Sequence, residues 1–180
     1  MRHPNQIQGR FFKFRDFSQW DDDAKRENRV PKVVRKRMVL VLGKPDNKRQ
    51  GFVKIVTVAP TQAAGVDADL FIPIAPCPKR NKKDHQLHVA NFEWSRHSHP
   101  LYTKHSYFRL DQIYDVPLDV LEPYMWSQSE HVALQKKSRE WLIRAVARRQ
   151  ANLVDIPAER QATELLAQDG DCSAHHVESS

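Results

Sequence analysis

Residues 36–62 carry the clearest hydrophobic pattern of the chain, and this pattern predicts a central β-hairpin. The first strand is the apolar run 38–42, and the second is the Val/Ile/Thr-rich run 52–59. Residues 43–51 between them contain two glycines and a proline, which are typical of a turn. A continuous apolar run bounded by such residues is typical of a strand buried on both faces.

Two polar residues flank this hairpin at its open end. Arg37 precedes the first strand and Thr61 follows the second. Because the open ends of an antiparallel pair lie side by side, the guanidinium and the hydroxyl are expected to converge at one rim of the sheet.

Three further stretches predict strands. Residues 10–15 alternate aromatic and basic side chains, which favours a strand whose aromatic residues anchor the core, with base stacking as the alternative. Residues 70–74 contain Pro73, which confines a strand to an edge or an end. Residues 106–116 predict a strong strand, and its broken alternation indicates a bulge. Residues 118–121 predict a turn or a short terminal strand.

Helical patterns are confined mainly to the C-terminal part. Residues 127–149 predict a helix, because Ser127 and Glu130 have capping-box spacing. Its apolar stripe consists of Leu134, Trp141, Leu142, Ala145 and Val146. Residues 21–36 predict a charged loop with one helical turn capped by aspartates. Residues 152–168 predict one short helix.

Residues 75–105 interrupt the strand pattern and predict a long insertion, attached to the body through Leu87, Val89, Phe92 and Trp94. Six residues near this insertion could bind zinc, namely Cys77, His85, His88, His97, His99 and His105. Their spacing fits no standard zinc finger, so we expect neither a metal site nor a cofactor. The histidines are expected to be solvated, with acid–base chemistry as the alternative role.

Charge is distributed unevenly along the 180 residues, whose formal net charge is +7. Residues 1–37 contain eleven Lys/Arg and five Asp/Glu, residues 78–105 contain six and two, and residues 150–180 contain one and six. A basic body favours a polyanionic partner such as nucleic acid, with a solvated, soluble surface as the alternative. The acidic residues 151–180 are expected to form a largely disordered tail.

Other sequence features limit the cellular setting. No apolar run approaches the ~20 residues that cross a bilayer, and no secretory signal is visible, so we expect no membrane association. Cys77 and Cys172 lie in dissimilar surroundings, which argues against a disulfide and for a reducing interior. The expected location is intracellular and cytoplasmic, with the nucleus as the alternative.

Four segments, in order, resemble the PemK/MazF toxins of toxin–antitoxin systems. KRMVLVL (36–42) resembles their "RP-V-L-V" strand, and IVTVAPTQ (55–62) their threonine-ended second strand. FIPI (71–74) is similar to "HVPL", and SYFRLDQIYDVPLDVL (106–121) is similar to "S-V-L-x-D-Q-I-R-T-V-D-x-x-R-L". The resemblance implies an SH3-like β-barrel with a C-terminal helix over residues 1–150, with the insertion within it. CcdB shares that fold.

The resemblance also implies a metal-independent endoribonuclease that leaves a 2′,3′-cyclic phosphate. The family's key arginine and threonine correspond to Arg37 and Thr61. The family proline after the arginine is Met38 here, and its Gly-Ser-Glu-Gln run is absent from residues 16–36. A homodimer and a protein antitoxin or inhibitor are the implied protein partners.

The sequence therefore predicts an RNA-binding protein with endoribonuclease activity. Phosphate contacts are expected from the basic residues near the hairpin and insertion, namely Arg35, Lys36, Lys48, Arg49, Lys79, Arg80, Lys82 and Lys83. The alternatives are a non-catalytic interaction module on the same fold, and a structural or regulatory domain whose ribonuclease site has decayed.

Overall fold

The structure is a computed structural model that describes residues 6–27, 29–45, 49–60, 67–79, 85–90, 105–125 and 130–154. The chain divides into two compact units, Met1–Arg144 and Ala145–Ser180. The first unit contains the strands, both short helices and the start of the long helix α4. In the second unit the described residues complete α4.

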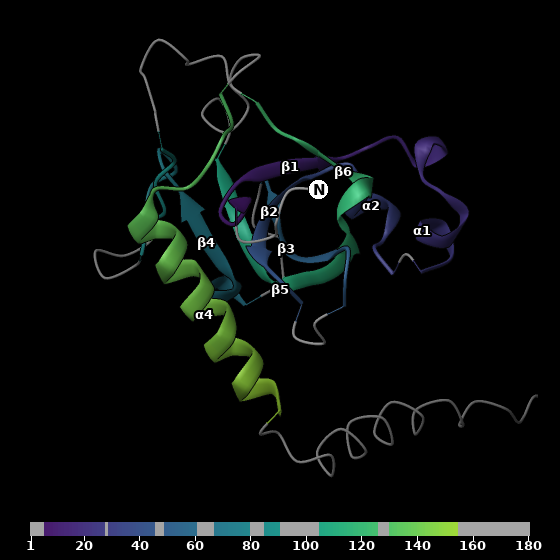
Figure 1. Cartoon of the computed structure of the whole chain (residues 1–180). Coiled ribbons are helices and arrows are strands. Elements are labelled where there is room, and N and C mark those ends of the chain that lie inside the picture. Colours follow the sequence, from purple (N-terminus) through teal and green to yellow (C-terminus); the bar gives the residue numbers. More distant parts are fainter. Residues whose placement is uncertain are drawn as a thin grey trace, which may run out of the picture. The chain divides into compact units, whose positions relative to one another are not determined.

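The first unit is built on one antiparallel sheet of six strands in the order β4-β5-β3-β2-β1-β6 (Figure 1). The strands are β1 (Phe11–Phe14), β2 (Met38–Gly43), β3 (Phe52–Ala59), β4 (Phe71–Ile74), β5 (Ser106–Pro117) and β6 (Leu121–Pro123). The predicted mainly-β architecture with a C-terminal helix is thus confirmed. The pairing of the described strands does not close, because β4 and β6 form its two edges.

The central hairpin is confirmed, since β2 and β3 pair antiparallel and almost every residue of both is buried. The edge position expected from Pro73 is also confirmed, because β4 pairs with β5 at one end of the sheet. The predicted bulge lies in β5. Val56 is opposite Ile113 but Thr57 is opposite Arg109, so residues 110–112 fall outside the register of the β3–β5 pair.

One face of the sheet packs against the short helices α1 (Asp22–Glu27) and α2 (Lys32–Arg35). The buried cluster on this face includes alternate strand residues together with Trp20, Ala24 and Val34. Helix α1 begins at the predicted aspartate cap, because the Asp21 carboxylate accepts a 2.6 Å hydrogen bond from the Ala24 amide. The aromatic residues of β1 are buried, which confirms their role in the core.

The start predicted for the C-terminal helix is wrong. Helix α4 spans Lys136–Val154, whereas the Ser127 capping box was expected to begin it nine residues earlier. Ala133 and Leu134 instead form β-bridges with Arg10 and Val89, far away in the sequence, and the Leu134 amide donates to the Gly9 carbonyl at 2.8 Å. These tertiary hydrogen bonds hold the segment extended. Residues 126–129, which include Ser127, lie outside the described part.

Residues 85–90 attach part of the predicted insertion to the sheet. Leu87 forms a parallel bridge with Ile74, and Leu87 and Val89 are buried, as expected. Three further predictions fall on residues outside the described part. They are the attachment through Phe92 and Trp94, the predicted helix 152–168 beyond Val154, and the acidic tail beyond Val154.

No helix in the described part of the chain has the length and apolarity needed to cross a membrane.

Candidate functional site

Three neighbouring strands each place a polar side chain at the same end of the core. On each strand, two core residues at alternate positions and one polar residue, at the next alternate position, point to the same face of the sheet. We call each such set of three residues a row. The rows are Val41-Val39-Arg37, Val53-Ile55-Thr57 and Val116-Tyr114-Gln112. Because alternate residues of a strand point to the same face, these polar ends meet at one place.

The three side chains, hereafter the Arg37 cluster, share one acceptor. The Oε1 atom of Gln112 accepts a hydrogen bond from Arg37 Nη1 at 3.1 Å and another from Thr57 Oγ1 at 2.8 Å. Thr57 is fully buried, whereas Arg37 and Gln112 are half-buried. A guanidinium carries five N–H donors, and Gln112 engages one of them.

The β5 bulge explains why Gln112 reaches this position. Residues 110–112 are not in register with any residue of β3, so the strand advances by three residues and brings the Gln112 amide over Thr57. Bulges of this kind re-aim side chains. Residues 75 positions apart in the sequence are thereby joined by one hydrogen bond.

The surroundings of the cluster are charged and partly buried. Arg109 forms a two-point ion pair with Asp111 while its guanidinium lies 4.8 Å from the centre of the Phe71 ring. The hydrogen bond to Asp111 raises the pKa of Arg109. Burial raises the pKa of Tyr114, as does the Asp111 charge, while the nearby Arg109 and Arg37 act to lower it. Tyr114 is therefore a neutral donor near pH 7.

A groove of about 620 Å³ lies beside Tyr114, between α1 and the ends of β3 and β5. Its lining combines three arginines, two carboxylates and three apolar or aromatic residues: Arg26, Arg29, Arg49, Glu27, Asp115, Phe52, Ile113 and Tyr114. The Arg49 guanidinium lies 3.9 Å from the centre of the Phe52 ring. Basic and aromatic side chains together suit a single nucleic-acid strand.

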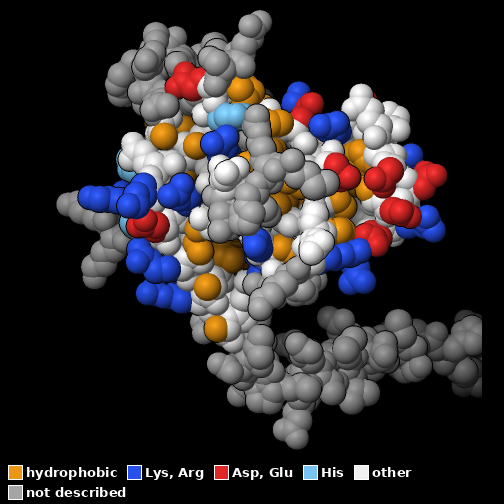
Figure 2. Space-filling model, viewed as in Figure 1, with side chains coloured by type: hydrophobic (Ala, Val, Ile, Leu, Met, Phe, Trp, Pro, Cys, Tyr) orange, Lys and Arg blue, Asp and Glu red, His pale blue; other side chains and the backbone are white. Residues whose placement is uncertain are grey.

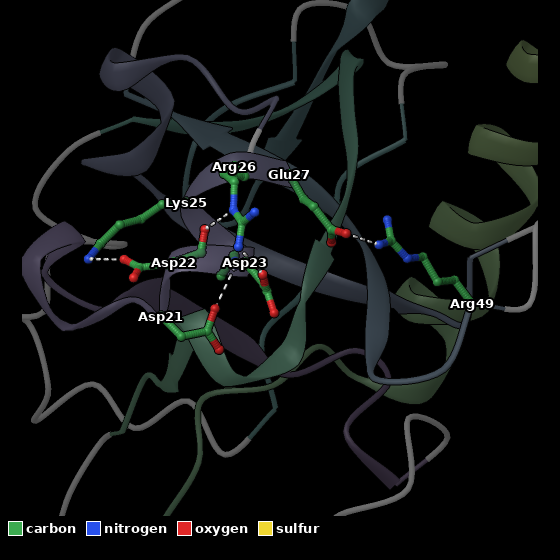
Figure 3. A network of polar contacts seen from close by, with 8 residues as sticks. Asp21, Asp22, Asp23, Lys25, Arg26, Glu27 and Arg49 are labelled. Atoms are coloured by element: carbon green, nitrogen blue, oxygen red, sulfur yellow. Dashed lines mark hydrogen bonds and ion pairs between the residues drawn. The ribbon is translucent and has the colours of Figure 1, made fainter.

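Two arginines that line this groove form ion pairs with carboxylates. Arg49 Nη2 contacts Glu27 Oε1 at 2.5 Å, and Figure 3 shows this pair reaching across from α1. Arg26 is paired with Asp23 at 2.6 Å within the same helix. Arg26 and Arg49 are thus held in position by partners that also reduce the local positive charge.

The predicted site residues fall in different places. Arg37 lies in the cluster and Arg49 in the groove, whereas Lys79 lines a separate cavity. Lys36 is exposed, and Arg35 packs over Phe17 at 4.3 Å. The remaining predicted residues lie outside the described part: Lys48, Thr61, Arg80, Lys82 and Lys83.

Within the described ranges, no group of three or more His, Cys, Asp or Glu residues is arranged to hold a metal ion. Cys77 is a buried free thiol, and His85 and His88 lie beside the start of α4. His97 and His99 lie outside these ranges.

Thr57, Gln112 and Tyr114 are not among the site residues predicted from the sequence. A signal was present, because the apolar alternation of each strand ends in one polar residue on the core side. Combining these rows required the register between β3 and β5. Comparisons with protein-family models, curated proteins and solved structures found no match to this chain.

Proposed function

We propose that this protein binds RNA and cleaves it without a metal ion, as a divergent PemK/MazF-like endoribonuclease on an SH3-like sheet. The observation that supports this most is the hydrogen bond between Arg37 and Gln112. Arg37 opens the strand that resembles "RP-V-L-V", and Gln112 belongs to the "D-Q-I" segment. Two separate points of resemblance therefore converge on one pair of side chains.

The proposed chemistry is transfer within the RNA chain. The ribose 2′-oxygen attacks the adjacent phosphorus, loses its proton to solvent, and the 5′-oxygen leaves with a proton. The products are a 2′,3′-cyclic phosphate and a 5′-hydroxyl end. Arg37 would stabilise the extra negative charge of the pentavalent phosphate, because its further N–H donors can form charge-assisted hydrogen bonds.

Gln112 and Thr57 would act as positioning residues. A long arginine side chain has many rotamers, and the Gln112 acceptor holds one N–H of Arg37 in place while the buried Thr57 hydroxyl holds Gln112. Such support reduces the ordering cost when a phosphate arrives. The adjacent groove, with its arginines beside Phe52 and Tyr114, would carry the flanking nucleotides.

The first experiment measures binding of the whole protein to a single-stranded RNA over a range of salt concentrations. Several phosphate contacts should lower affinity by about 10³-fold or more between 50 and 200 mM salt. Arg49→Gln should weaken binding, because it removes the cation over Phe52. An affinity that does not change with salt would contradict RNA binding.

The second experiment tests cleavage of the same RNA in a chelator. Arg37→Ala should reduce the rate by about 10²–10³-fold, which is typical for loss of one transition-state donor. Gln112→Ala should lower the rate less and leave a pH profile of the same shape. Arg15→Ala is the matched control, since it removes the same charge from an exposed position after β1.

Three results decide between the hypotheses. Loss of cleavage in Arg37→Ala, with thermal unfolding unchanged and Arg15→Ala fully active, supports the proposed site. Cleavage retained in folded Arg37→Ala contradicts it. A wild-type protein that binds RNA but never cleaves it favours the non-catalytic interaction module.

A further inference from the structure

A second cavity, of about 450 Å³, lies where the segment 85–90 meets the start of α4. None of its lining residues belongs to the Arg37 cluster or to the groove beside it. Its volume lies within the usual range of sites for small organic ligands. The residues that form it all belong to the first compact unit.

Three hydrogen bonds, each with a backbone group as donor or acceptor, hold the segment 85–90 in place beside this cavity. Gln86 Nε2 donates to the Cys77 carbonyl at 2.6 Å, and the Leu87 amide donates to the Pro73 carbonyl at 2.9 Å. On the other side, the His88 amide donates to the buried Ser138 hydroxyl at 2.9 Å. The segment is therefore held between β4 and α4, and little ordering is needed on binding.

An aromatic pair forms one wall of the cavity. The His85 ring stacks on the Trp141 indole with 4.1 Å between ring centres and an angle of 6° between their planes. Burial lowers the pKa of His85, and the neighbouring Lys79 and His88 lower it further. The imidazole is thus mainly neutral at pH 7. Because His85 is exposed, its ring offers a flat surface on which another ring can stack.

Cations outnumber carboxylates around this pair. The lining contains Lys79, Lys137 and Arg144 against the single carboxylate of Glu140. Figure 2 shows Lys and Arg side chains gathered beside the start of α4, whereas Asp and Glu gather over α1. A ligand for this cavity should therefore combine a flat ring with a negative charge.

We propose that this cavity binds a nucleotide, with its base stacked on the His85–Trp141 pair and its phosphate held by Lys79, Lys137 and Arg144. Stacking on an aromatic surface is open to every base, and the cations supply charge-assisted hydrogen bonds to phosphate. The nucleotide is either free or the end of an RNA strand. The proposal does not depend on cleavage at Arg37.

The test is calorimetric titration of the full chain at low salt with adenosine 5′-monophosphate, adenosine and inorganic phosphate. The monophosphate should bind about tenfold or more tightly than either fragment, because only it uses both the stack and the cations. Lys137→Gln combined with Arg144→Gln should weaken its binding about tenfold or more. His85→Ala should do the same but leave phosphate binding unchanged, whereas His85→Phe should retain affinity.

Matched controls separate this site from general charge effects. Lys136→Gln with Arg148→Gln removes the same charge from exposed positions of the same helix, and should leave affinity unchanged. Arg37→Ala should also leave it unchanged, which distinguishes this site from the cleavage site. Equal weakening by the control pair, or His85→Ala equal to wild type with the monophosphate, would overturn the proposal.

A second ligand identifies the source of the nucleotide. If a 5′-phosphorylated RNA pentamer binds and loses affinity in the same variants while the monophosphate does not bind, the site takes the end of a strand. If the monophosphate binds by itself, a free nucleotide suffices. If the folded wild-type protein binds neither at millimolar concentrations, the proposal is wrong.

Discussion

At the scale of single residues, Gln112 is the position on which the candidate site depends. The Thr57 hydroxyl is fully buried, and a buried hydroxyl without a partner would cost about 1–3 kcal/mol. Gln112 supplies that partner and holds the Arg37 guanidinium with the same oxygen atom. One amide thus links the stability of the core to the orientation of a charged group.

A prediction at the residue scale concerns two glycines. Gly9 and Gly51 both have positive φ, at 80° and 75°, but only Gly9 is crowded, since an added Cβ would lie 2.4 Å from Cδ of Arg139. Gly51→Ala should therefore destabilise the protein by about 1–2 kcal/mol, the cost of left-handed backbone. Gly9→Ala should cost more, as measured by denaturant unfolding.

The excess cost at Gly9 can be assigned by a double-mutant cycle. In an Arg139→Ala background the side-chain atoms at 2.4 and 2.9 Å are gone, so Gly9→Ala should cost about as much as Gly51→Ala. If the excess persists in that background, contact with Arg139 is not its cause.

At the scale of elements, the two parts of β5 differ in their pairing and in their place relative to the candidate site. Its first residues pair with both β4 and β3, and after the bulge it pairs with β3 alone among the described strands. Residues 113–115 also line the groove. The part of the strand that is paired on one side therefore carries the candidate binding surface.

This arrangement predicts a gradient of hydrogen exchange across the sheet. Amides of β3 should exchange most slowly, because β3 is paired on both sides and its residues 53–59 are buried. Amides of β6, a strand of three residues at the edge, should exchange much faster. Native-state exchange followed by NMR measures both, and equal protection of β6 and β3 would contradict the observed strand order.

At the scale of the whole molecule, charge is separated along the sequence. Residues 155–180 contain six Asp/Glu and one Arg, whereas the protein as a whole has a net charge of +7. A tethered acidic segment can reach an effective concentration near the millimolar range. The tail could thereby compete with RNA for the basic surfaces of the first unit, although an inert solubilising tail is the simpler hypothesis.

Truncation after Val154 tests this competition. The shortened protein should bind RNA more tightly than the full chain at low salt, and the difference should shrink as salt screens the tail. A full-length variant with the six tail carboxylates changed to amides should behave like the truncated protein. Equal affinities of all three proteins at low salt would show that the tail does not control RNA binding.

Most elements of the fold were predictable because their causes are local. The apolar runs of β2 and β3, the proline of β4 and the aspartate cap of α1 each act within a few residues. The start of α4 was not predictable in this way. Ser127 and Glu130 match a capping box, but the following residues are held extended by bonds to β1, Gly9 and the segment 85–90.

The sequence by itself determined which residues form strands, where the core lies and that Arg37 stands at the open end of the hairpin, because these follow from periodicity and turn chemistry. Only the tertiary structure decided which polar groups meet Arg37. The register shift in β5 selects Gln112, and pairing of β4 with residue 87 places His85 against Trp141. Both are consequences of long-range pairing, which no local pattern encodes.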